Sequence, residues 1–159
     1  MKESRQKNGG TFKVETAHAI LRFADKYILQ LRDDKPEIAA RGQWSLFGGQ
    51  IDDGEGPQEA IKRELLEELA IKIDDFKFLY YTDYYVDFVK GMVRTWFFFA
   101  SVDNVWGGHK LKEGKDVGAF RFNDLKKLSI PDVMVQALNC FHSGKENPKY
   151  YNIKERKIP

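Results

Sequence analysis

A segment from Gly49 to Ile71 combines a glycine-rich start with a helix that carries many acids. Between Pro57 and Leu69 apolar residues recur at helical spacing, and proline costs little in the first turn because its missing N–H needs no partner there. The whole segment holds seven acids against two bases. A fold that contains this helix must bury one of its faces and compensate the charge of another.

At about 100° per residue, the helix separates into two arcs. The predicted apolar arc comprises Ile61, Leu65, Leu66 and Leu69. The predicted acidic arc comprises Glu64, Glu67 and Glu68. Acids so close together oppose helix formation unless another charge compensates them. A solvated charged face is the ordinary interpretation of such an arc.

A bound cation is the alternative, because no bases are interleaved on this arc and a glycine-rich turn is expected just before the helix. The glycines of that turn are Gly48, Gly49, Gly54 and Gly56. Glycine lets the backbone approach a ligand closely. Carboxylate oxygens suit Mg²⁺ or Mn²⁺, and Mg²⁺ usually completes its shell with water and substrate phosphates. One cysteine and three histidines make a zinc site difficult to assemble.

The rest of the chain predicts one α/β domain with helices on a mixed sheet. Strands are expected at 15–23, 26–31, 44–47, 76–88, 92–102 and 117–122, with a turn at Gly48 and Gly49 after the third. Asn123 is expected to cap a short helical turn, and Pro131 and Asp132 to begin a final helix. We expect a flexible leader at 1–13, the domain at 14–143 and a basic tail at 144–159.

The acidic segment holds glycine, glutamate, arginine and apolar positions in a fixed order. These positions are Gly49, Glu55, Arg63, Glu64, Leu65, Glu67, Glu68 and Ile71. They resemble the signature of the Nudix hydrolases, enzymes that cleave nucleoside diphosphates linked to another moiety. Ala70 stands where that family usually has glycine, so we expect a small cost at the end of the helix. The resemblance implies an α/β/α sandwich.

The same resemblance implies a metal site on the acidic arc. Glu67 and Glu68 would hold Mg²⁺, and Glu64 would complete the site or orient water. The carbonyl oxygen of Gly49 is a further candidate ligand. In-line attack on a phosphoanhydride requires positioning and charge stabilisation rather than a covalent intermediate. No serine, histidine or cysteine triad is therefore expected.

Other residues are assigned to loop structure and to the substrate. The resemblance implies that Arg63 pairs with Glu55 and ties the loop to the helix. Gly48 and Glu55 are also assigned to ligand binding, through the glycine-rich loop. Arg32 and Arg41 are candidates for the substrate phosphates, because arginine can hold phosphate oxygens with two hydrogen bonds.

The general base is left open between Glu64 and two residues of a later loop, Glu113 and His109. Histidine has an ordinary pKa near about 6.5, which suits a base, whereas Glu113 could equally be a solvent-facing loop acid. The aromatic candidates for stacking on a nucleobase are Tyr84, Tyr85 and Trp96.

Charge and composition limit the partners. The net charge of +2 is divided into two ends of +3 each and a middle, residues 14–143, of −4. This distribution makes nucleic acid an unlikely partner. No apolar run is long enough to span a bilayer, and the single cysteine, Cys140, is typical of a reducing compartment. We expect a cytoplasmic protein with a small-molecule nucleotide substrate, and the aromatic-rich hairpin makes a homodimer plausible.

Three functions remain open. The first is a Mg²⁺-dependent hydrolase of a nucleoside diphosphate derivative, such as a nucleotide sugar. The second is a pyrophosphatase that removes (oxidised) deoxynucleoside triphosphates from the nucleotide pool. The third is a non-catalytic nucleotide sensor, which we expect to have lost some of the four glutamates that this sequence retains.

Overall fold

The computed structural model describes residues 6–7 and 10–144. Its strands are β1 (Gln6–Lys7), β2 (Gly10–Thr11), β3 (Val14–Phe23), β4 (Lys26–Leu31), β5 (Trp44–Ser45), β6 (Phe47–Gln50), β7 (Lys77–Val86), β8 (Gly91–Ser101) and β9 (Asp116–Arg121). Its helices are α1 (Pro57–Leu69), α2 (Asp132–His142) and the 3₁₀ turns η1 (Trp106–Gly108) and η2 (Phe122–Lys127). Within the described residues, no helix combines the length and apolar character needed to cross a bilayer.

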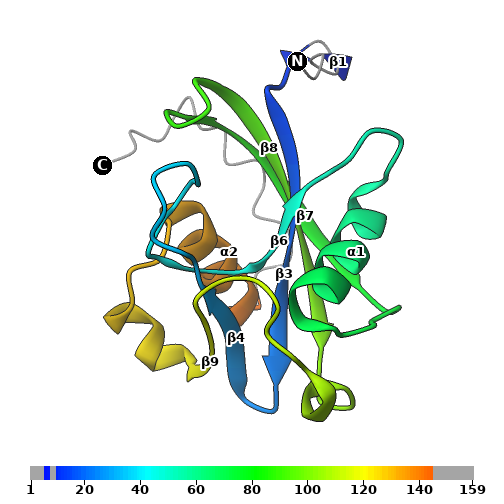
Figure 1. The fold of residues 1–159 in the computed structure, drawn as a ribbon, viewed down its shortest axis with the longest axis vertical. Coiled ribbons are helices and arrows are strands. Elements are labelled where there is room, and N and C mark those ends of the chain that lie inside the picture. Colours follow the sequence, from blue (N-terminus) through cyan, green and yellow to red (C-terminus); the bar gives the residue numbers. More distant parts are fainter. Residues whose placement is uncertain (1–5, 8–9, 145–159) are drawn as a thin grey trace.

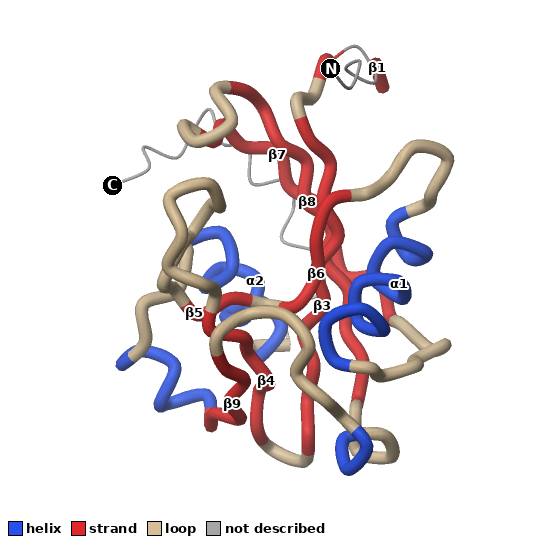
Figure 2. Tube along the Cα trace, viewed as in Figure 1, coloured by secondary structure: helices blue, strands red, loops and turns tan. Residues whose placement is uncertain are grey.

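β3 organises the seven-stranded mixed sheet. It pairs in parallel with β8, and the outer partner of β8 is the antiparallel β7 (Figure 2). Residues 16–19 of β3 pair with β6, whereas residues 21–23 pair with β4. The strands β4 and β6 thus share one edge of β3 in succession. Gln30, near the end of β4, and Gly48 and Gly49 of β6 line a common cavity described below.

The two α-helices cover opposite faces of this sheet, as predicted for an α/β/α sandwich (Figure 1). Ala17, Ala19 and Leu21 of β3 pack in one core cluster with the buried face of α1. Ile20, which points the other way because side chains alternate along a strand, packs in a second cluster with α2.

Gly48 and Gly49 lie within β6, whereas the sequence analysis placed them in a turn. The predicted strand at 44–47 is also divided into β5 and β6. At Gly48, where φ is +148°, a Cβ atom would overlap the carbonyl oxygen of Ala17 on the neighbouring β3. Only glycine permits this approach. Gly48 therefore serves the close pairing of two strands, and the turn before α1 begins after β6.

Two predictions about helices were wrong. Leu66 is 53% exposed, because the buried stripe of α1 is shifted towards Ala60 and Glu68. The turn η2 begins without a side-chain cap, so Asn123 has no capping role. At Ala70 the expected departure from glycine is visible as a left-handed backbone with φ of 55°. Alanine adopts this conformation at a cost of roughly 1 kcal/mol.

His18 on β3 should make the fold sensitive to acid. Burial, assisted by the charge of Arg32, lowers the pKa of His18 to about 3. The unfolded chain binds this proton near pH 6.5, so stability is complete above that pH and is lost as the pH falls towards 3. We expect His18→Leu to remove up to about 1.4 kcal/mol of this dependence per pH unit. Urea unfolding across this range measures it, and parallel pH profiles for both proteins would contradict the assignment.

Candidate active site

Arg63 on α1 connects the acidic residues on and before the helix. Its guanidinium donates two hydrogen bonds to Glu55, from Nε at 2.8 Å and from Nη2 at 2.9 Å. Nη1 donates to Glu64 at 2.9 Å and to Glu67 at 3.3 Å, and Nη2 also donates to the carbonyl of Gln50 at 3.0 Å. The hydrogen bond from Arg63 lowers the pKa of the Glu55 carboxyl, and the same contact raises the pKa of Arg63. The arginine thus fixes the loop before α1 against the helix.

Glu68 is the acid in the least favourable environment. Its side chain is 4% exposed, and its Oε2 has no hydrogen-bond partner among the described residues. Burial raises the pKa of Glu68, the neighbouring Glu64 and Glu113 raise it further, and Arg32 opposes them. A buried acid oxygen without a partner beside other acids fits a hard cation. No ready-made group of three metal ligands is present among the described side chains. Arg63 donates hydrogen bonds to both Glu64 and Glu67.

Residues 109–115, called the strap here, bring Glu113 to this site. The backbone N–H groups of Lys110 and Lys112 donate to the carbonyls of Leu69 and Glu68, each at 2.8 Å. These carbonyls belong to the last turn of α1, where no partner exists within the helix. The strap then reaches the end of β4 through the N–H of Lys115, which donates to Leu31 at 2.9 Å. Its course over the end of α1 explains why Glu113 lies near Glu68.

A cavity of about 300 Å³ joins these parts. It is lined by Gln30, Arg32, Asp33, Lys35, Ile38, Gly48, Gly49, Glu64, Glu68, Glu113 and Gly114. Three of its acids come from α1 and the strap. The loop that follows β4 supplies two bases, Arg32 and Lys35, and a fourth acid, Asp33, which lies 3.5 Å from the Lys35 ammonium. Arg32 is anchored by a hydrogen bond from its Nε to the carbonyl of Ala39 at 2.8 Å. Such a cavity can hold a cation beside a phosphate chain.

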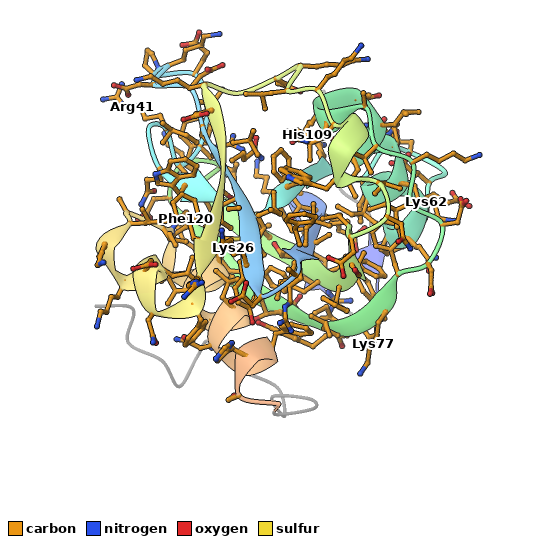
Figure 3. All side chains as sticks on the ribbon, turned by 90° about the horizontal axis from the view of Figure 1, so that it is seen from below. Lys26, Arg41, Lys62, Lys77, His109 and Phe120 are labelled. Carbon is orange, nitrogen blue, oxygen red and sulfur yellow. The ribbon has the colours of Figure 1, made fainter. Side chains whose placement is uncertain are left out.

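Several candidates lie elsewhere. Arg41 is outside the cavity, more than half exposed, with its Nε 3.5 Å from an oxygen of Asp34 (Figure 3). His109 stacks on Trp106 with ring centres 3.6 Å apart, so it anchors the strap instead of lining the cavity. The aromatic candidates for stacking are also absent from the cavity wall.

The sequence analysis missed Lys35 and Gln30. Lys35 lies in the polar loop that follows Arg32. Its charge was the only sequence feature that could have marked it as a candidate for the cavity. Gln30 is nearly buried and donates from Nε2 to the carbonyl of Leu46 at 3.3 Å. Its contact with the cavity depends on how β4 and β6 are placed along β3, which no local pattern indicates.

Residues 12–140 match the sequence profile of the NUDIX domain. A MutT NUDIX hydrolase from Burkholderia pseudomallei is 23% identical, with 79% of this chain and 95% of that chain covered and a TM-score of 0.68. The NUDIX domain of Shewanella oneidensis NrtR, complexed with ADP ribose, is 18% identical, with coverage of 88% and 93% and a TM-score of 0.71. A bifunctional NMN adenylyltransferase/ADP ribose pyrophosphatase from Francisella tularensis, complexed with AMP and a Mn ion, is 20% identical, with coverage of 82% and 41% and a TM-score of 0.65. At these identities the structural likeness concerns the fold.

Proposed function

Because the chain belongs to the NUDIX family, we propose that it cleaves the pyrophosphate linkage of a nucleoside diphosphate joined to another moiety, such as a nucleotide sugar. As a Nudix hydrolase it acts on phosphoanhydride bonds, and the attached moiety is the part we propose. The observation that carries this proposal is the cavity that the acids Glu64, Glu68 and Glu113 line together with the bases Arg32 and Lys35.

We propose Mg²⁺ as the resident cation, with Mn²⁺ as the alternative. Glu64, Glu67, Glu68 and the carbonyl of Gly49 would hold it, and the partnerless buried oxygen of Glu68 supports this assignment. When bound, such an ion neutralises phosphate charge and lowers the pKa of a coordinated water. The Mn ion in the Francisella structure agrees with a divalent cation in a similar fold.

The chain's own groups would orient the substrate and move one proton. Arg32, fixed by its bond to Ala39, is placed to hold a phosphate opposite the acids. Glu64 and Glu113 both line the cavity and are the two candidates for the general base. Arg41 would bind phosphate only if its loop moved inward.

If Glu113 is the base, we expect Glu113→Gln to lower kcat about a hundredfold, with little change in KM, because proton removal contributes to the reaction step and not to binding. The acid limb of the pH–rate profile should also disappear. Lys112→Gln is the matched control, since it keeps the backbone bond from the strap to α1. An unchanged kcat for Glu113→Gln would assign the base to Glu64.

Gly49→Ala should disturb the site directly. A Cβ atom at Gly49 would lie 2.5 Å from Oε1 of Glu64, which must then shift away from Arg63. We expect kcat/KM to fall about tenfold or more and the free energy of unfolding to fall by about 1–3 kcal/mol. Gly56→Ala is the control, because a Cβ there meets nothing within 4 Å. Equal activity of the two variants would show that the position of the Glu64 side chain is unimportant for the reaction.

A substrate panel tests the function. Purified protein with Mg²⁺ would be given nucleoside diphosphate sugars (ADP-ribose included), dinucleotides and normal or oxidised deoxynucleoside triphosphates, and each product would be identified. Release of a nucleoside monophosphate and a sugar phosphate is expected. Preference for triphosphates with pyrophosphate release would favour the pool-cleaning alternative, to which the MutT structure points. Tight nucleotide binding without turnover would favour the sensor.

We further propose a cytoplasmic enzyme that acts as a homodimer and has neither a nucleic-acid nor a membrane partner. The single cysteine, Cys140, is buried and forms no disulfide, which agrees with a reducing compartment.

A further inference from the structure

The outer edge of β7 is unusually well suited to pair with another strand. β7 (Lys77–Val86) is a ten-residue strand at the end of the sheet, and no described strand pairs with its outer side. It carries only two charges, Lys77 and Asp83. Asp83 is turned inward, because Arg94 of β8 holds both of its oxygens, at 2.7 and 2.8 Å. Proteins normally protect long edges with charges, prolines or covering segments, and this edge has little of that protection.

Apolar side chains are exposed along the same hairpin. Phe78 is 48% exposed and Tyr85 is 49% exposed, one near each end of β7. Both lie on the face of the sheet that α1 covers. Phe78 is opposite Phe98, which packs in the core cluster of α1, and Tyr85 shares its face with Tyr81 and Asp83 by alternation.

Thr82 lies at the middle of the paired positions of β7. A register shift between Phe78 and Tyr80 leaves Leu79 as the extra residue on β7. Four paired positions then remain on each side of Thr82, and counting outward from it in an antiparallel self-pairing places Phe78 opposite Tyr85. Side chains opposite each other across such a pair lie on the same face, as these two do. In the same register Tyr80 lies opposite Tyr84, so aromatic pairs would form at two positions on each side of Thr82.

We propose that a second copy of this chain docks along β7, antiparallel and centred on Thr82, with Phe78 of each copy against Tyr85 of the other. The two sheets become one continuous sheet, and the interface is isologous, as in most homodimers. β8 and β3 separate β7 from β4 and β6, so the cavity stays open in both copies. Lys77, at the outer margin of the molecule in Figure 3, marks one end of this surface.

Sedimentation velocity on the full chain over a range of concentrations tests the interface without any measure of activity. We expect a monomer–dimer equilibrium in which Phe78→Lys and Tyr85→Glu each raise the dissociation constant at least about tenfold. The double variant should recover affinity, because each introduced lysine faces an introduced glutamate. Phe88→Lys is the control, since Phe88 is 53% exposed but lies beyond the end of β7.

A protein that stays monomeric at all concentrations would overturn the proposal, and so would single variants without effect or a double variant without recovery. Hydrogen–deuterium exchange on the wild-type protein provides a second measurement if a variant fails to fold. Backbone amides of Lys77–Val86 should become more protected from exchange as the protein concentration rises. Protection that does not change with concentration would also overturn the proposal. The inference rests on the homodimer of the proposed function, but catalysis enters none of these measurements, so a failed interface leaves the proposed hydrolysis untouched.

Discussion

Glu68→Gln is expected to lower kcat/KM for the best substrate by about three orders of magnitude, equivalent to about 4 kcal/mol of transition-state stabilisation. Glutamine preserves the volume of this nearly buried side chain but cannot carry the charge that a hard cation requires. Burial already raises the pKa of Glu68, so cation binding must displace a proton. The affinity for Mg²⁺ should therefore rise with pH in the wild-type protein and lose most of that dependence in the variant.

Kinetics and calorimetric titration with Mg²⁺ measure both effects. With a chelator present and near neutral pH, the free energy of unfolding of Glu68→Gln should equal or exceed that of the wild-type protein. The reason is that the raised pKa of Glu68 lowers wild-type stability as the pH rises above the unfolded carboxyl value of about 4.3. Asp75→Asn, at an exposed acid outside the site, should change nothing. Wild-type kcat/KM in Glu68→Gln would show that the cation does not bind here.

The fold was largely predictable because its strongest signals are local. Helix α1 has the predicted bounds, since proline, helical spacing and the run of acids all act within one segment. The hairpin of β7 and β8 was predicted from its aromatic and β-branched residues to within two residues at each end. The error at Leu66 has a physical origin: periodicity fixes which residues share a face, but packing against β3 and β6 decides how far that face is rotated.

The candidate site was predictable only where a residue's own chemistry marks it. Arg32 and Glu113 were singled out by charge and loop position, and both line the cavity. The strap could not be predicted, because Lys110 and Lys112 hold α1 through backbone N–H groups that nearly every residue possesses. The exchange of partners along β3 likewise depends on long-range pairing.

Arg63→Lys is expected to lower kcat/KM about a hundredfold and the free energy of unfolding by about 1–3 kcal/mol. A lysine ammonium can satisfy one of the partners of Arg63, but it cannot bridge Glu55, Glu64 and the carbonyl of Gln50 together. The acids would then repel one another, and the loop before α1 would lose its tie to the helix. Lys62→Gln is the matched control, because the neighbouring Lys62 makes a weak surface ion pair with Asp74 at 3.9 Å. Steady-state kinetics and urea unfolding test both variants. Full activity in Arg63→Lys would mean that one positive charge suffices here and that the forked geometry of arginine contributes nothing. A loss of activity in Arg63→Lys but not in Lys62→Gln would mean that this forked geometry organises the acidic site.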